Sequence, residues 1–206
     1  HASGELRWQH NDHDYEVTLS VRAFLVGSRH WRSKGRIDVT GLAPLRFSDS
    51  WRNERAAHFD RERQRVVFSS RSQTVPLEPG AQDQVSLYLQ LAAAVAGAPE
   101  RFMPGTRLQV QTATVRDAIS WLLTLAGSES LQLQDELHQT LKWVCQPRSQ
   151  YDARVEFWVT PAQAWMPVRI RITQVSGSYI DLIWRGTEPL PDLPPVPDST
   201  SANTPS

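Results

Sequence analysis

Hydrophobic residues occupy alternate positions along several stretches of the chain, which is the pattern of a β-strand that buries one face. The longest such stretch runs from Tyr15 to Leu25, where apolar residues alternate with polar or charged ones as far as Arg22. Ile37 and Val39 also alternate with polar neighbours, and Val66 to Phe68 follows a polar turn. The first third of the chain therefore predicts strands joined by hairpins, which pair most simply as antiparallel neighbours.

The pattern changes between Gln82 and Gly97. The alanine-rich sequence from Ala92 to Ala96 favours a helix, which Pro79-Gly80 precedes and Gly97 and Pro99 end. Because all but a narrow polar stripe of this helix is apolar, we expect it to pack on a sheet or to plug the mouth of a barrel. A strand at Val85 to Leu91 is the alternative.

The second half of the chain returns to extended structure. Gly105 to Thr114 is predicted to be a strand, whereas the apolar segment Ala118 to Ala126 fits either a helix or a strand. Strict alternation then predicts three strands, at Arg154 to Val159, Val168 to Thr173 and Tyr179 to Trp184.

Alternation also predicts how the last strands pair. A three-residue loop at Ser176-Gly177-Ser178 would set Ile172 opposite Leu182, whereas a two-residue loop would set Ile172 against Asp181. We favour the three-residue loop because it keeps apolar residues together. If the two preceding strands pair through Val159 and Val168, one face of the sheet carries a charged and aromatic cluster. Its members are Glu156 opposite Arg171, Trp158 opposite Arg169, and Asp181 diagonal to Arg171.

These elements predict a mainly β protein, with an antiparallel sheet curled into a barrel or half-barrel and one packed helix around residues 82–97. A single β-rich domain would span residues 1–186. The Pro-rich and Ser-rich sequence at residues 187–206 buries too little apolar surface to fold, and it predicts a disordered tail.

Composition narrows the class of protein without identifying it. The 206 residues are 40% apolar, and 22 basic side chains balance 22 acidic ones, which argues against a generally basic nucleic-acid binder. No apolar stretch is long enough to span a bilayer as a helix. The densest basic stretch, Arg29 to Arg36, suits an anionic lipid or glycan but equally fits a solvated strand face. Cys145 is the one cysteine, so no internal disulfide is expected, and we interpret it as a small core residue.

A series of short motifs occurs in a particular order. They are Gly35-Arg36-Ile37, Gly41-Leu42-Ala43-Pro44, Phe59-Asp60, Gly80-Ala81-Gln82-Asp83 with Ser86, Phe157-Trp158-Val159 and Met166-Pro167-Val168-Arg169-Ile170-Arg171. In this order they resemble the DUF3108 family of bacterial proteins, whose function is unknown.

The resemblance implies a location more than an activity. Members of the family are mainly envelope proteins of Gram-negative bacteria, usually made with an N-terminal export or anchor segment, so a periplasmic or envelope-associated location is implied. We expect no such segment within this chain, because His1 to Glu5 lack the basic start and apolar stretch of a secretory signal. The resemblance also implies that Ala118 to Ala126 is a strand.

The motif with Gln82, Asp83 and Ser86, together with Gln90 one turn further on, is the first candidate site. Asp83 at a helix start can cap free backbone amides or complement the helix dipole. Alternatively, the stripe faces a cavity and hydrogen-bonds a polar group of a ligand.

The cluster on the C-terminal sheet is the second candidate site. Arg169 and Arg171 can clamp an anion, and the Trp158 indole can pack on a sugar ring or a cation, beside Glu156 and Asp181. The alternative is a solvated face of cross-strand ion pairs, each of which contributes about 0.2–1 kcal/mol.

Catalytic chemistry has less support in the sequence. Glu156, Asp181 or Asp83 would suit a glycosidase only if one carboxyl had a raised pKa, and neighbouring arginines lower the pKa of a carboxyl. No nucleophile elbow or phosphate loop is present, and the segment His10 to Asp14 lacks partners at metal-ligand spacing. The sequence assigns no catalytic residues for an enzymatic function, and no cofactor or metal is expected.

The leading hypothesis is a non-catalytic envelope protein that binds an amphipathic, lipid-like ligand or a glycan in the curl of the sheet. An enzyme acting on envelope polysaccharide is the first alternative. An adaptor that contacts another envelope protein through its tail or its basic region is the second. No nucleic-acid partner is expected.

Overall fold

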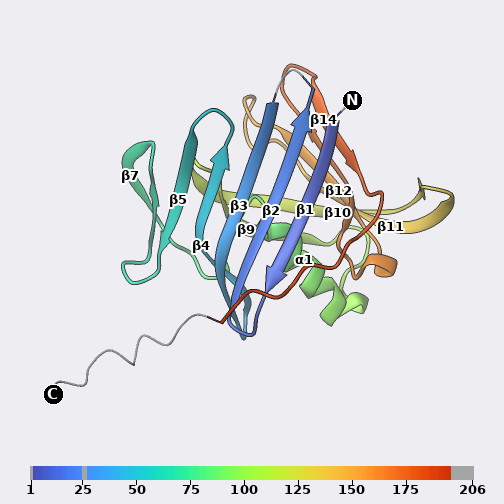
Figure 1. Cartoon of the computed structure of the whole chain (residues 1–206), viewed down its shortest axis with the longest axis horizontal. Helices are drawn as coiled ribbons and strands as arrows, with labels where there is room; N and C mark the ends of the chain where they lie inside the picture. The colour runs from blue at the N-terminus through green and yellow to red at the C-terminus, as the bar shows by residue number, and fades with distance from the viewer. Residues whose placement is uncertain (1, 25–26, 196–206) are drawn as a thin grey trace.

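The computed structural model describes residues 2–24 and 27–195, which form two β-sheets around one helix (Figure 1). The first sheet consists of seven antiparallel strands that follow one another in chain order. They are β1 (Ala2–His10), β2 (Asp14–Ala23), β3 (Gly27–Asp38), β4 (Gly41–Ser50), β5 (Glu54–Asp60), β6 (Arg65–Phe68) and β7 (Arg71–Pro76).

The second sheet also has seven strands, ordered from β14 back to β8. They are β8 (Gln82–Asp83), β9 (Arg107–Ala113), β10 (Ala118–Leu133), β11 (Glu136–Cys145), β12 (Arg154–Val159), β13 (Pro167–Thr173) and β14 (Tyr179–Ile183). Neighbours are antiparallel, except that the short β8 pairs in parallel with β9. The short helices η1 (Pro99–Arg101) and η2 (Pro161–Gln163) lie in connections. The predicted fold class is confirmed.

Most of the regular alternating stretches form the predicted strands, but Val39 lies in the turn after β3 and is fully exposed instead of continuing the strand. Tyr15, Val17 and Leu19 are buried on β2 as their alternation requires, while Leu25 lies outside the described residues. The ambiguous segment Ala118 to Ala126 belongs to the long strand β10, in agreement with the family resemblance. Its antiparallel pairing with β9 and β11 supplies the backbone partners that a helix would have found internally.

The helix α1 (Ser86–Gly97) begins four residues later than predicted. Gln82 and Asp83 form the strand β8, because their backbones pair with Thr112 and Ala113 of β9. A strand at Val85 to Leu91 is wrong, since Leu87, Tyr88 and Leu91 pack as helical residues in the core.

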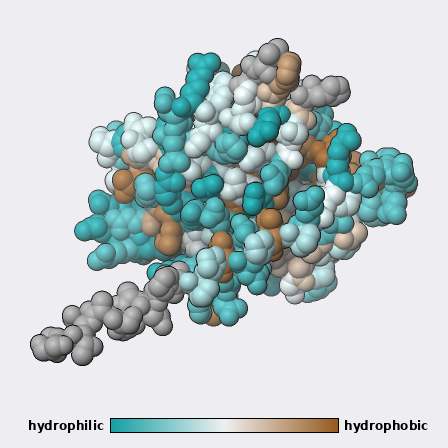
Figure 2. All heavy atoms as spheres, in the orientation of Figure 1, coloured by the Kyte–Doolittle hydropathy of each residue, from teal (hydrophilic) through white to brown (hydrophobic). Residues whose placement is uncertain are grey.

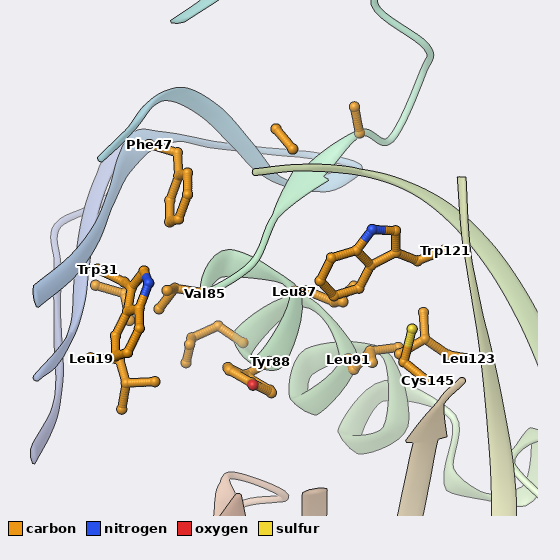
Figure 3. Close-up of a cluster of buried hydrophobic side chains, with 14 of the residues drawn as sticks. Leu19, Trp31, Phe47, Val85, Leu87, Tyr88, Leu91, Trp121, Leu123 and Cys145 are labelled. Carbon is orange, nitrogen blue, oxygen red and sulfur yellow. The ribbon is translucent and has the colours of Figure 1, made fainter. Parts of the chain in front are cut away.

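The helix lies between the two sheets (Figure 3). Trp31 and Phe47 of the first sheet lie on one side of α1, and Trp121 and Leu123 of the second sheet lie on the other. Each such side chain contributes about 1.5–3 kcal/mol when fully buried. The interior enclosed by the curled sheets is therefore occupied by α1 and by the core side chains around it.

The outward surface of the first sheet has a different character (Figure 2). It is mainly hydrophilic or neutral over β1 to β5, with small separate hydrophobic areas. The ion pairs of Glu16 with Arg32 and Lys34 lie on this face. One face of each strand therefore builds the core and the other meets solvent.

The two sheets approach each other at β1 and β14. A Cβ atom on Gly4 would lie 2.7 Å from Cδ2 of Leu182, so the strands pack closely through side chains there. After β14 the chain continues along β1 toward its C-terminal end, where the Leu193 amide donates a hydrogen bond of 3.0 Å to the His10 carbonyl. Residues 187–195 of the predicted tail are thus described and contact the domain, and residues 196–206 lie outside the described residues.

The predicted register of the last hairpin is wrong by two residues. Ile172 pairs with Ile180 rather than with Leu182. The Gly177 backbone has φ of +86°, and its amide donates to Gln174, so the three-residue loop is 175–177. A type I turn followed by a left-handed residue requires glycine at the third loop position, and this requirement shifts the strands.

The preceding pair of strands matches the prediction more closely. Glu156 pairs with Arg171 and Trp158 with Arg169, as the alternation predicts. Val159 pairs with Pro167 instead of Val168, because the register shifts after Trp158. Asp181 lies directly opposite Arg171 instead of diagonal to it.

Candidate functional site

Asp83 binds the first turn of α1 to the first sheet. Its Oδ1 accepts hydrogen bonds from the amides of Val85 and Ser86, at 2.9 and 2.8 Å. Its Oδ2 accepts a bond of 2.5 Å from the Ser33 hydroxyl, which also bonds the Tyr15 hydroxyl. Asp83 therefore satisfies helix amides that would otherwise have no partner.

The Asp83 carboxyl is completely buried. Burial raises its pKa to about 6, although the bonds from Ser33, Ser86 and Val85 favour the ionised form. Burial also raises the pKa of Tyr15, so that the phenol stays protonated. The result is a closed polar network inside an apolar core.

Gln82 and Gln90 attach the same helix to the turn between β3 and β4. The Gln82 side-chain amide donates to the Leu42 carbonyl at 2.8 Å. Gln90 Oε1 accepts from the Leu42 amide, and Gln90 Nε2 donates to the Thr40 carbonyl. Gly41 gives this turn its shape, since its φ is +117° and a Cβ would collide with the Gln90 side chain.

The structure thus places Gln82, Asp83, Ser86 and Gln90 together, but against strands β2 to β4. Most of their side-chain polar atoms are bonded to protein groups of this chain, although Gln82 Oε1 is buried without a hydrogen-bond partner. Gln82, Asp83 and Ser86 are buried and Gln90 is half-buried, and the contacts of the stripe hold α1 in the curl.

The second candidate group lies on the outward face of β12, β13 and β14. Phe157, Ile170 and Leu182 point into the core, so the intervening residues point away from it. These outward residues are Glu156, Trp158, Arg169, Arg171 and Asp181, and the pairing of the strands brings them together.

The Trp158 side chain is packed against its neighbours and is not accessible to a ligand. The Lys142 ammonium and the Arg169 guanidinium lie 4.8 and 4.7 Å from its ring centroid, and they come from the strands on either side of β12. Its indole N–H donates to Glu129 at 2.6 Å, and Leu133 and Val168 complete a small hydrophobic cluster. With 3% of its surface exposed, Trp158 offers no free ring face to a sugar.

The charges around Trp158 are largely paired. Arg169 forms two hydrogen bonds to the Asp181 carboxylate, at 2.8 and 2.6 Å, which raise the pKa of the guanidinium. Burial alone would raise the pKa of Glu156, but hydrogen bonds from Lys142 and Arg154 hold it below its usual value. Glu156 is therefore ionised at neutral pH.

Arg171 differs from the other basic residues of the cluster. Within the described residues it has no ion pair, and its guanidinium lies 4.4 Å from the ring centroid of Tyr179. Its Nε is buried without a hydrogen-bond partner. Stacking on an aromatic ring orients a guanidinium whose charge has not been neutralised.

An open depression of about 240 Å³ lies at the end of β13 that follows Arg171. It is lined by Pro147, Ser149, Gln150, Asp152, Arg154, Thr173, Gln174 and Val175. Thr173 lies two residues after Arg171 on the same face of β13. Arg154 of β12 is the cross-strand partner of Thr173. The lining offers hydroxyl, amide, carboxylate and guanidinium groups, which suit the hydroxyl groups of a carbohydrate.

Several residues of this region were not singled out from the sequence. Arg154 lies two residues before Glu156, and Thr173 lies two residues after Arg171. Because residues two apart on a strand share a face, the sequence pattern already places both on the face of the cluster. Lys142 and Glu129 belong to other strands, and their approach to Trp158 depends on the curl of the sheet.

Asp83 and Glu156 do not combine into a general acid and base. Asp83 has a raised pKa but no contact with solvent, and Glu156 has a lowered one. Among residues 2–24 and 27–195, no group of three or more His, Cys, Asp or Glu is arranged to hold a metal ion. Within the same residues, no helix has the length and hydrophobicity needed to cross a membrane.

Residues 2–182 match the model of a family described as a protein of unknown function, DUF3108. The chain belongs to this family. The DUF3108 match includes both candidate groups described above and ends within β14. A search of the curated proteins finds no match to this chain.

Solved structures are similar to this DUF3108 protein at low sequence identity. A beta-barrel-like protein of the family DUF1849 from Brucella abortus has a TM-score of 0.52 and 10% identity, over 89% of this chain and 87% of its own. A DUF1089 family protein from Pseudomonas aeruginosa has a TM-score of 0.39 and 10% identity, over 90% and 92% of the two chains. The first similarity shows a shared β-barrel-like fold.

Proposed function

We propose that this DUF3108 protein is a non-catalytic binding protein of the Gram-negative envelope, and that its ligand is an anionic glycan. The observation that carries the proposal is Arg171, a guanidinium without an ion pair that is stacked on Tyr179 near an open depression. The envelope location rests on the family resemblance.

The position of the site follows from what surrounds it. The curl of the sheets holds α1 and the core, so an amphipathic ligand would enter only if the helix left. The depression between the 147–152 segment and the β13–β14 turn is open, and it offers hydrogen-bonding groups next to a positive charge. An acidic sugar presents hydroxyl groups and a carboxylate in just such proximity.

The absence of a suitably placed acid among the described residues favours binding over hydrolysis. A glycosidase needs a protonated carboxyl in contact with the glycosidic oxygen. Here the carboxyl with the raised pKa, Asp83, is enclosed on the other side of the sheet.

Titration calorimetry with tri-galacturonic acid and with neutral maltotriose tests the proposal. We expect the acidic trisaccharide to bind more tightly, and Arg171→Ala to weaken that binding at least tenfold. The matched control is Arg36→Gln, an exposed arginine of the first sheet, which should bind like the wild type.

Failure of the wild type to bind either trisaccharide would overturn the glycan proposal. Equal binding by folded Arg171→Ala would overturn the site. Osmotic-shock fractionation of the native bacterium tests the location, since recovery in the cytoplasmic fraction would contradict it.

A further inference from the structure

Exposed aromatic side chains gather at one end of the molecule. Within the described residues, the aromatic side chains with large exposed fractions are Phe24 at 84%, Tyr151 at 80%, Tyr179 at 57% and Trp51 at 52%. We call these four residues the aromatic rim. Other large exposed apolar residues, such as Val39 and Met103, are aliphatic or contain sulfur.

Strand directions place the rim residues of the first sheet together. Phe24 follows the end of β2, and Trp51 follows the end of β4. Both strands run antiparallel to β3, so their ends lie at the same edge of the sheet. In Figure 1 these ends are toward the top of the view.

The second sheet brings its two rim residues to the same end. Tyr151 lies between β11 and β12, and Tyr179 begins β14, so both lie at one end of that sheet. The chain leaves the other end of β14 and reaches His10 at the far end of β1. Strands β1 and β14 therefore run in the same direction, and Tyr179 lies toward the start of β1.

Basic side chains accompany the rim on the first sheet. Arg22, Arg52 and Arg55 lie at or beside the ends of β2, β4 and β5, and none of them has an ion pair within the described part of the chain. The acids nearby, Asp49 and Glu54, are bound by Arg29 and Arg46. This end of the first sheet therefore carries uncompensated positive charge.

We propose that the aromatic rim is a contact surface for an anionic lipid bilayer. Aromatic rings favour the headgroup region, where an apolar ring and polar surroundings are both accommodated. Arginines next to them are attracted to anionic headgroups. The chain between β2 and β3 begins with Phe24 instead of the Gly, Asn or Asp typical of hairpin turns. The inference goes beyond the proposed function and does not depend on it.

Sedimentation of the full chain with sucrose-loaded vesicles tests the proposal. The vesicles contain either phosphatidylcholine alone or phosphatidylcholine and phosphatidylglycerol at a ratio of 3:1. We expect the wild type to bind the anionic vesicles, Phe24→Ser with Tyr151→Ser to lower the partition coefficient at least tenfold, and Arg52→Gln with Arg55→Gln to remove the preference for anionic lipid.

The matched control is Val39→Ser with Leu137→Ser, which changes two exposed aliphatic residues away from the rim and should bind within twofold of the wild type. The vesicles carry no glycan, so the outcome of this test is separate from that of the glycan site. The proposal is overturned if the wild type sediments with neither vesicle, or if the folded rim variant binds as well as the control.

Discussion

The Ser33 hydroxyl of β3 donates a hydrogen bond to the Asp83 carboxylate, which itself accepts bonds from the first amides of α1. The helix is thereby connected to a strand fifty residues away through one buried side chain. A buried carboxylate without a cationic partner is costly, and the cost is tolerated because every bond it accepts is well formed.

Replacement of Asp83 by asparagine should change the pH dependence of stability. Burial raises the Asp83 pKa to about 6, above its value in the unfolded chain. The contribution of Asp83 to the free energy of unfolding therefore decreases as pH rises from about 4 to about 6. The difference in free energy of unfolding between wild type and Asp83→Asn should follow this course. Urea titrations at half-unit pH steps measure it, and a difference independent of pH would contradict the assignment.

Asp83→Ala serves as the contrasting variant. It removes the acceptor for the amides of Val85 and Ser86, and a buried amide left without a partner costs about 1–3 kcal/mol. We therefore expect Asp83→Ala to be destabilised at every pH, by more than Asp83→Asn.

Gly35→Ala should strongly destabilise the protein. A Cβ at this position would lie 2.7 Å from Cα of Pro44 and 2.8 Å from a ring carbon of Tyr15, so backbone must move to admit it. We expect a loss of about 1–3 kcal/mol or more, as for other overpacked sites. Gly97→Ala is the control, because nothing lies within 4 Å of its added Cβ. Thermal melts that rank the two variants equally would refute the close approach.

Trp158→Ala should destabilise the protein by about 3–5 kcal/mol, the usual cost of removing a buried large aromatic. The indole packs between Lys142 and Arg169 and bonds Glu129, so all three side chains lose a partner. Tyr151→Ala, which removes an exposed aromatic, should change stability by less than about 0.5 kcal/mol. Chemical denaturation measures both, and a mild effect of Trp158→Ala would indicate a more open site.

Cys145 should react slowly with thiol reagents in the folded protein. The side chain is buried, and burial raises the thiol pKa to about 11, so little thiolate exists near neutral pH. Labelling at pH 8 should be much slower than in denaturant. Labelling of the native protein as fast as a free thiol would show that the end of β11, where Cys145 lies, is accessible to the reagent.

The sequence pattern predicts some contacts of the candidate residues and not others. Glu156 opposite Arg171 follows from alternation on two adjacent strands. The burial of Trp158 does not, because Glu129 and Lys142 reach it from β10 and β11. The polar stripe of α1 was visible in the sequence, but Ser33 as its partner was not, since no local signal links residues fifty positions apart.

By itself, the sequence determined the fold class, the faces of the strands and the presence of one apolar helix, because hydrophobic periodicity is a local property with a fixed repeat. The tertiary structure alone decided the register of the last hairpin, since a shift of two residues leaves every side chain on the same face. It also decided that Asp83 faces Ser33 and that Arg171 stays unpaired beside Tyr179. Those relationships depend on the curl of two sheets around a helix, where side chains distant in sequence compete for the same partners.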